Sequence, residues 1–158
     1  MRFQTIITHH FVKSEDLNHH GTLFAGRTAE WFVEAGLMSA AAFLPAENIV
    51  CVKIHGMNFT RPVPLGAIVE FESKAVLAGR TSLVSYIRLT QGGEQILDGF
   101  MTFVNVGADG RPIPHGVTLE ASNPAEEALL RTPEYQKKLA AVLCCGMLEF
   151  LEEPYESC

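Results

Sequence analysis

The chain has 158 residues, of which 47% are hydrophobic and 19% charged, and its formal net charge is -6. This length suits one domain that buries most of its apolar surface, and the acidic balance argues against nucleic acid as a partner. No apolar run is long enough to span a membrane and the first residues lack a signal-peptide core, so we expect a cytoplasmic protein with no membrane partner.

The cysteines and histidines do not predict a metal site. The cysteines are spaced neither as zinc ligands nor as a disulfide framework: Cys51, Cys144, Cys145 and Cys158. We expect Cys51 in the core of a strand and the chain in a reducing compartment. The pairs His9-His10 and His19-His20 place neighbouring rings on opposite sides of an extended chain, so we expect no metal ion.

The N-terminal part of the chain predicts a strand, a polar turn and a long helix. Residues Arg2–Val12 are rich in Thr, Ile, Phe and Val, which favour a strand. The Ser, Asp, Asn and Gly residues between Lys13 and Gly21 are typical of a turn. An apolar helix is then expected from Ala25 to Leu44, because Pro45 cannot continue it.

A run of strands follows the helix. Alternating apolar and polar residues, separated by glycine-containing turns, predict strands over residues 49–59 (with Gly56 marking a bulge), 67–78, 81–91 and 95–106. A run of strands segregated from one helix indicates the α+β class. The economical packing is a curved antiparallel sheet wrapped around the one long central helix, and its open edges favour a dimer.

The C-terminal part of the chain changes in character. Pro124 and Pro133 suit helix starts, and Tyr135–Leu151 carries a broken apolar stripe. We therefore expect an α+β domain over residues 1–118 and a C-terminal helical extension over residues 119–158, packed on the same domain.

The expected central helix carries two carboxylates, Glu30 and Glu34, one turn apart. The helix is apolar on nearly every face, and carboxylates are rarely buried unless they are paired or functional. For Glu34 the alternative to a chemical role is a position at a dimer interface, with an ion pair to Arg27 or Arg80. For Glu30 the alternative is a surface pair with Arg27.

Three motifs resemble those of the acyl-CoA hydrolase branch of the hotdog-fold thioesterases. The loop Asn18–Gly26, followed by Glu30–Glu34, resembles the pattern N-x-x-G-T-L-F-G-G and then W-M-D or W-M-E. Phe59–Gly66 resembles F-x-R-P-V-x-x-G, and Gly79–Ser82 resembles the hairpin motif G-[RT]-T-S. The resemblance runs over roughly residues 14–114, which is the α+β domain expected from the order of elements.

The resemblance implies a hotdog fold and hydrolysis of an acyl-CoA thioester at a dimer interface. In that family an acid on the central helix acts as nucleophile or activates water, and an N–H group at the helix start polarises the thioester carbonyl. Coenzyme A is then part of the substrate rather than a cofactor. The expected assembly is a homodimer at least, with a tetramer or hexamer as the larger options.

The resemblance also assigns roles to individual residues. Glu34 is expected to act as base or nucleophile, Asn18 to orient water or the carbonyl, and the Gly26 N–H group to stabilise the oxyanion. The two arginines of the motifs are expected to meet the phosphates of coenzyme A. The residues expected to bind substrate are His20, Phe24, Ala25, Arg61 and Arg80.

The sequence departs from the family pattern at one position. The family's acid lies two residues after the tryptophan, which here is Val33, and Glu34 follows one residue later. One residue rotates a helix by about 100°, so the two positions point in different directions. Three readings stay open. A local bulge brings Glu34 into place, another residue such as Glu30, His19 or Asn18 serves instead, or the site binds acyl-CoA with little or no turnover.

Three functions therefore compete at this stage. The first is acyl-CoA hydrolysis. The second is a non-catalytic acyl-CoA-binding or sensing domain, which Val33 at the acid position supports. The third is a dehydratase on the same scaffold, which in that family would use a catalytic histidine near the loop. His20 is the support for this third function.

Overall fold

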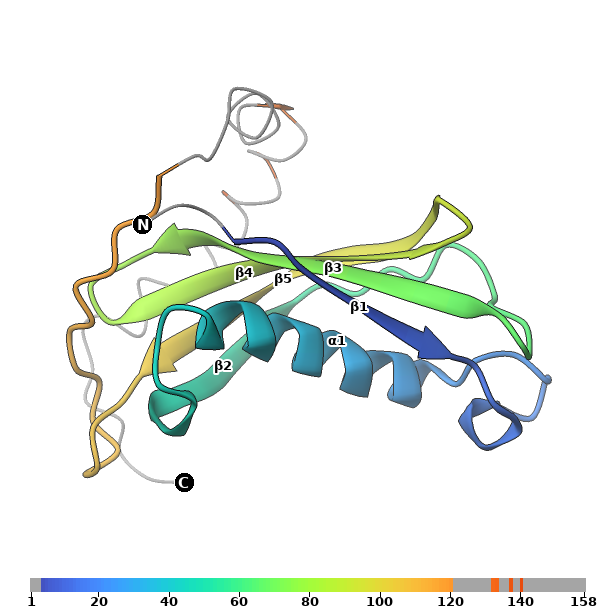
Figure 1. Cartoon of the computed structure of the whole chain (residues 1–158), viewed down its shortest axis with the longest axis horizontal. Coiled ribbons are helices and arrows are strands. Elements are labelled where there is room, and N and C mark those ends of the chain that lie inside the picture. Colours follow the sequence, from blue (N-terminus) through green and yellow to red (C-terminus); the bar gives the residue numbers. More distant parts are fainter. Residues whose placement is uncertain (1–3, 121–131, 134–136, 138–139, 141–158) are drawn as a thin grey trace.

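The structure is a computed structural model that describes residues 4–120, 132–133, 137 and 140, and it shows one long helix packed on an antiparallel sheet (Figure 1). The elements are, in chain order, β1 (Ile6–Phe11), the short helix η1 (Ser14–Asp16), α1 (Ala25–Ala41), the short helix η2 (Ala46–Asn48), β2 (Ile49–His55), β3 (Ile68–Ala78), β4 (Ser82–Gln91) and β5 (Glu94–Asn105). This architecture confirms the expected α+β class.

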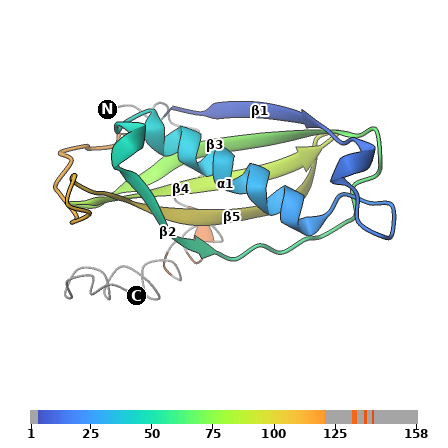
Figure 2. The ribbon, with the colours of Figure 1, turned by 90° about the horizontal axis from the view of Figure 1, so that it is seen from below.

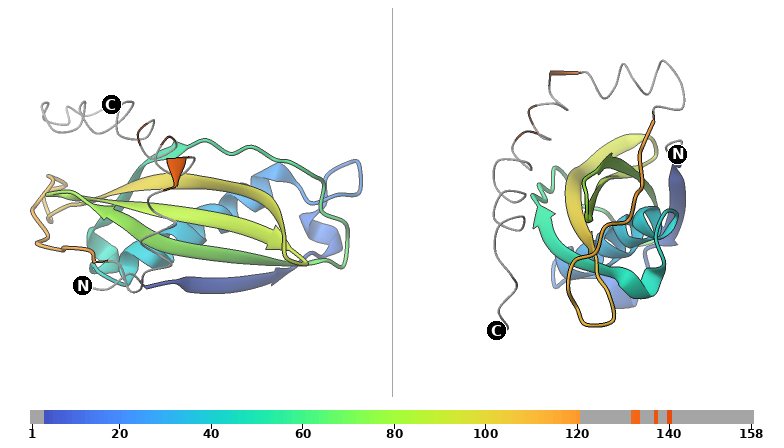
Figure 3. Two further views of the ribbon diagram at one scale, coloured as in Figure 1. Left: turned by 90° about the horizontal axis from the view of Figure 1, so that it is seen from above. Right: turned by 90° about the vertical axis from the view of Figure 1, so that its left-hand side faces the viewer.

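The strands form one sheet in the order β1-β3-β4-β5-β2, and each neighbouring pair is antiparallel. The sheet curves, and α1 crosses its concave side (Figure 2). A view along the sheet shows the strands bending partly around the helix (Figure 3). β1 and β2 are the two edges, so their outer backbone groups have no partner strand within the described chain.

One face of α1 supplies the centre of the core. Trp31, Phe32 and Ala35 are buried against the sheet. The opposite face of the helix is open, with Leu37 and Met38 37% and 41% exposed. Within one chain the sheet therefore covers the helix on one side, and apolar side chains remain on the other side. None of the helices in the described part of the chain is long and apolar enough to cross a membrane.

The helix approaches the sheet closely at Gly36. A Cβ atom there would lie 2.7 Å from the Met101 sulfur and 3.2 Å from Ile87 Cδ1. Buried serines bridge the same contact, since Ser39 Oγ lies 2.8 Å from the Gly36 carbonyl and 2.7 Å from Ser85 Oγ. The polar groups of this layer are therefore paired inside the core rather than left without partners.

Two element boundaries and the burial of one residue differ from the sequence prediction. β2 ends at His55 rather than Phe59, because Gly56 takes a positive φ of 74° and turns the chain out of the ladder. α1 ends at Ala41 rather than Leu44, since the last turn tightens. Cys51, expected in the core, is exposed because β2 is an edge strand. The expected C-terminal helices lie almost entirely outside the described residues.

The close helix–sheet contact generates a stability prediction. Gly36→Val should lower the free energy of unfolding by about 1–3 kcal/mol, because its side chain has no room between α1 and Met101. Ala41→Val is the matched control, since it places the same β-branched residue at the exposed end of the same helix and should cost less than about 1 kcal/mol. Urea denaturation measures both. Equal losses would show that helix propensity, not the contact, sets the requirement for glycine.

Candidate functional site

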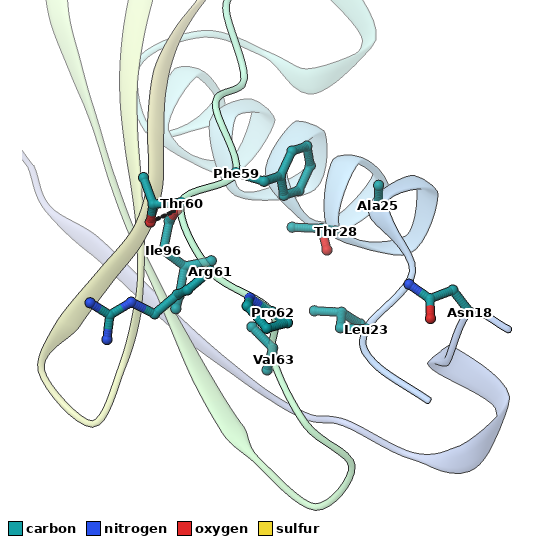
Figure 4. Close-up of a pocket in the computed structure, with 10 residues that line it drawn as sticks. All are labelled: Asn18, Leu23, Ala25, Thr28, Phe59, Thr60, Arg61, Pro62, Val63 and Ile96. Atoms are coloured by element: carbon teal, nitrogen blue, oxygen red, sulfur yellow. Dashed lines mark hydrogen bonds between the residues drawn. The ribbon is translucent and has the colours of Figure 1, made fainter. Parts of the chain in front are cut away.

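A cavity of about 360 Å³ lies between the N-terminal end of α1 and the segment that follows β2. Two parts of the chain, 18–28 and 59–63, form its walls, and β5 adds one residue (Figure 4). The lining residues are Asn18, Leu23, Ala25, Thr28, Phe59, Thr60, Arg61, Pro62, Val63 and Ile96. The cavity thus combines apolar side chains with an amide, hydroxyls and one guanidinium, as ligand sites commonly do.

Backbone hydrogen bonds hold the two walls in place. The Leu23 N–H group donates to the Val63 carbonyl at 2.8 Å, which ties the loop before α1 to the segment after β2. On the other side Thr60 donates to the Ile96 carbonyl through its N–H group at 3.0 Å and its hydroxyl at 2.7 Å. The segment 59–63 is therefore fixed from both sides although it is not a strand.

Asn18 orders the loop that precedes α1. Its side-chain Oδ1 accepts the backbone N–H groups of His20 at 2.9 Å and Thr22 at 3.2 Å. The backbone N–H group of Asn18 donates to the Thr22 carbonyl at 2.8 Å. Gly21 closes the turn with a positive φ of 76°. The Nδ2 atom lies 3.1 Å from Thr22 Oγ1. An amide carries two N–H groups, and the contacts of the described residues use one of them.

The first turn of α1 begins at the cavity without a side-chain cap. Phe24 is the N-cap residue, and its side chain accepts no hydrogen bond from the first-turn N–H groups. The N–H groups of a first helical turn have no intrahelical acceptor and form the positive end of the helix dipole. Ala25 lines the cavity, and Gly26 follows it in the same turn. This end of the helix is suited to an oxygen atom that carries partial negative charge.

A side chain at Gly26 would require the neighbouring Phe24 ring to move. A Cβ atom at Gly26 would lie 2.4 Å from Phe24 Cε1. Phe24 is nevertheless 53% exposed, so its ring covers the helix start rather than filling the core. The prediction that Phe24 binds substrate stays a prediction, since its ring does not line the cavity.

The two predicted arginines lie at different places. Arg61 lines the cavity and pairs with Glu94 on the β4–β5 hairpin, and its side chain extends away from Leu23 (Figure 4). Arg80 lies at the β3–β4 turn, beyond the other end of β4. Of these two arginines, Arg61 is the one placed within the described chain to meet the phosphates of a molecule bound in this cavity.

Glu34 does not line the cavity. It is exposed and acts electrostatically on His10 of β1, so it lies on the flank of α1 that faces β1. His10 stacks on Trp31 with ring centroids 4.3 Å apart, and burial lowers the His10 pKa, an effect that the charge of Glu34 partly offsets. α1 is an uninterrupted α-helix from Ala25 to Ala41, so no bulge turns Glu34 toward the cavity.

The other candidates are also placed by their contacts. Glu30 pairs with Arg27 at 2.6 Å, which is the surface pair expected for it. His20 is exposed and its ring lies 3.9 Å from that of His19, outside the cavity lining. Within the described chain Arg27 pairs with Glu30 and Asp16 rather than with Glu34, so an ion pair of Glu34 across a dimer interface stays a prediction.

The structure brings together Asn18, Ala25 and Arg61 from the expected set, and adds residues that sequence reasoning missed. Phe59 and Thr60 line the cavity and precede Arg61 in the same motif. The sequence signal that could have indicated them is an aromatic residue close to an arginine and two prolines. Thr28 gave no signal, because its position on the cavity side of α1 depends on how the helix is rotated on the sheet. No group of His, Cys, Asp and Glu able to hold a metal ion occurs among the described residues.

Comparison with solved structures and known sequences places this fold among thioesterases. A hexameric acyl-CoA thioesterase superimposes with a TM-score of 0.73 and 25% identity, over 90% of this chain and 94% of that one. The acyl-CoA hydrolase of Staphylococcus aureus, solved with butyryl coenzyme A, coenzyme A and coenzyme A disulfide, superimposes with a TM-score of 0.73 and 20% identity, over 93% of this chain and 92% of that one. At this identity the second likeness shows the shared fold.

Sequence similarity agrees with the structural likeness. The acyl-CoA thioester hydrolase YkhA of Bacillus subtilis strain 168, itself described as uncharacterized, is 25% identical over 128 residues, which are 77% of this chain and 73% of that protein. Residues 20–97 match the sequence model of the thioesterase superfamily, and this range contains the α1 helix start and the segment that together form the cavity. The chain belongs to the thioesterase superfamily and has its hotdog fold.

Proposed function

We propose that this protein is an acyl-CoA thioester hydrolase whose substrate carbonyl binds at the N-terminal end of α1. The observation that carries the proposal is the uncapped first turn of α1, which begins at a cavity lined by Asn18, Ala25 and Arg61. The related proteins named as acyl-CoA hydrolases support the same substrate class.

The cavity suggests a place for each part of the substrate. The side chains of Leu23, Phe59 and Ile96 offer an apolar wall for the acyl chain. Arg61 at the cavity edge offers a positive charge to a phosphate of coenzyme A, and Glu94 must then release it or share it. The thioester carbonyl between these parts would lie at the helix start.

The first-turn amides would supply the main catalytic effect. Attack of water on the thioester carbon forms a C–O bond and places negative charge on the carbonyl oxygen. The N–H groups of Ala25 and Gly26 would stabilise that charge, and preorganised donors of this kind commonly give the largest share of acyl-transfer catalysis. Collapse of the intermediate breaks the C–S bond and releases coenzyme A as a thiolate, which takes up the proton that water loses. Asn18 would orient the attacking water or the carbonyl through its second side-chain N–H group.

The cavity lining within one chain supplies no general base. No carboxylate lines the cavity among the described residues, and Val33 occupies the position of the family's acid. Glu34 is the remaining carboxylate of α1 that lacks an ion-pair partner in the described part of the chain, because Glu30 is held by Arg27. A base role for Glu34 requires that a second copy of the chain bring it to the cavity.

The absence of a carboxylate from the lining favours one second candidate, an acyl-CoA-binding domain without turnover. The same cavity would bind the ligand, and the helix start would hold the carbonyl without activating water. Measured hydrolysis separates the two functions. The dehydratase reading has no comparable support, since His20 does not line the cavity.

The hydrolase proposal predicts a defined pattern of activity. Purified protein should release coenzyme A from at least one member of a panel of short, long and aromatic acyl-CoAs, followed by chromatography because the cysteines react with thiol reagents. Asn18→Ala should lower kcat by about 10–1000-fold, the cost of losing a polarising donor. Glu30→Gln should stay within about twofold of wild type, since it changes only an exposed pair.

The position of Glu34 adds a second arm to this experiment. Loss of hydrolysis in Glu34→Gln but not in Glu30→Gln would assign the base to Glu34. Unchanged kcat in Glu34→Gln would show that the N–H donors and Asn18 act without it. Tight acyl-CoA binding by wild type with no hydrolysis of any substrate would overturn the hydrolase proposal in favour of the binding domain.

We also propose that the chain forms at least a homodimer through the β2 edge. Ile54 is 42% exposed and lies opposite the core residue Met101 in the β2–β5 register, so it faces the same side of the sheet as α1. Leu37 of α1 is exposed on that side of the molecule as well. A second copy pairing along β2 would satisfy the free edge and cover these apolar side chains. The hexameric state of related thioesterases is compatible with a dimer as the building unit.

A charge at this edge should disrupt assembly. Ile54→Lys should shift the mass measured by light scattering from a multiple of 17.3 kDa to the single chain, because an unpaired charge cannot be buried at the interface. Ile7→Lys is the matched control, since Ile7 is 55% exposed on β1, the opposite edge of the sheet. It should leave at least the dimer intact. A wild-type protein that measures as a single chain would contradict the proposal.

A further inference from the structure

We infer that Asp16 is a positioning residue of this site. It fixes the position of the Ala25 and Gly26 amides by binding Phe24, which precedes them, and Arg27, which follows them. The inference rests on the proposed function, in which those amides polarise the thioester carbonyl. Asp16 itself does not line the cavity, so its effect would act through Phe24 and Arg27.

Asp16 is the most buried carboxylate of the described chain, with 3% of its surface exposed. One carboxylate oxygen accepts the Lys13 N–H group at 2.9 Å, and the other lies 3.1 Å from Arg27 Nε. Its backbone carbonyl accepts the Phe24 N–H group at 2.8 Å. A buried carboxylate is costly unless its oxygens are paired, and here both are.

The two residues that Asp16 binds at the start of α1, the N-cap residue Phe24 and Arg27, flank the proposed donors. Phe24 precedes Ala25, and Arg27 follows Gly26, so the peptide groups between them are held at each end by the same aspartate. The Phe24 contact involves backbone atoms and fixes where the helix starts. The Arg27 contact involves the side chain and fixes how the first turn is rotated. Together they leave the Ala25 and Gly26 amides little freedom to move.

The charge of Asp16 also matters at this place. Arg27 puts a positive charge in the first helical turn, where the dipole is already positive and where cations are unfavourable. Asp16 and Glu30 share this guanidinium, but Glu30 is 54% exposed and an exposed pair contributes little. The buried Asp16 is therefore the partner that holds Arg27 in place.

Positioning of this kind should appear in kcat rather than in KM. Donors that act on charge developing in the transition state lower the barrier without tightening substrate binding. A displacement of about 1 Å in a reacting geometry can cost about 100-fold in rate. A residue needed only for stability would instead lower the melting temperature and leave the rate per folded molecule unchanged.

The test compares the variants Asp16→Asn and Arg27→Gln with wild type at a temperature where all three are folded. We expect kcat to fall at least about tenfold in both, with KM within about twofold. Arg27→Gln keeps the experiment informative if Asp16→Asn does not fold. Glu72→Gln is the matched control, because it breaks the Glu72–Arg88 ion pair between two strands of the sheet, away from the helix start, and should leave kcat unchanged.

Amide hydrogen exchange gives a readout that does not depend on hydrolysis. The Asp16 carboxylate also holds the turn over residues 13–16 through the Lys13 N–H group, so Asp16→Asn should loosen this turn and, with it, the backbone hydrogen bond from Phe24 to the Asp16 carbonyl. The Phe24 N–H group should therefore exchange faster in Asp16→Asn than in wild type, while amides in the middle of β4 should keep their wild-type rates. Unchanged kcat in both variants, a rise in KM alone, or an equal loss in Glu72→Gln would overturn the positioning role. If wild type hydrolyses no acyl-CoA, the proposed function fails, and unchanged exchange at Phe24 would then overturn the structural part of the inference as well.

Discussion

The structure depends on the close contact between α1 and the concave side of the sheet. There is no room for a side chain at Gly36, because the Met101 side chain of the sheet packs directly against the helix backbone there. Buried hydroxyls then tie helix carbonyls to the sheet, with Ser73 Oγ 2.7 Å from the Ala35 carbonyl and Ser39 Oγ 2.7 Å from Ser85 Oγ. A helix bound in this way cannot slide or rotate without breaking packed contacts and hydrogen bonds.

The fixed helix determines what its N-terminal end can do. Because α1 is anchored along its buried face, its first turn is presented at one edge of the molecule, where the loop before it and the segment after β2 close a cavity. Leu23 and Thr60 hold these two walls through backbone acceptors at Val63 and Ile96. The N–H groups at the helix start are thus oriented before any substrate arrives, which is the condition under which such donors are most effective.

Much of this arrangement followed from the sequence. Alternation along the strands and glycine-containing turns were sufficient for the β3–β4–β5 meander, because these signals are local. The end of β2 was misplaced, since Met57 and Phe59 continue the apolar alternation while the positive φ at Gly56 ends the strand. The exposure of Cys51 depends on which strand is an edge, which is a property of the whole sheet.

The site was predicted less completely than the fold. The spacing of Asn18, Ala25 and Arg61 from the family motifs was enough to place them at one cavity. The one-residue offset between Val33 and Glu34 left the direction of the carboxylate open. The uninterrupted helix removes the local bulge from the three readings, and the catalytic role of Glu34 stays a prediction. The contact of Asp16 with the helix start could not be predicted from a local sequence pattern, because it joins two segments that meet only in the folded chain.

The central claim is that the thioester carbonyl binds at the first turn of α1. A crystal structure with an acyl-CoA analogue whose thioester sulfur is replaced by a methylene group tests it directly, because this ketone keeps the carbonyl but cannot be hydrolysed. The account predicts the ketone oxygen at about 2.7–3.1 Å from the Ala25 or Gly26 nitrogen, with the acyl chain against Phe59. An analogue bound with its carbonyl away from the helix start, or bound outside this cavity, would contradict the account.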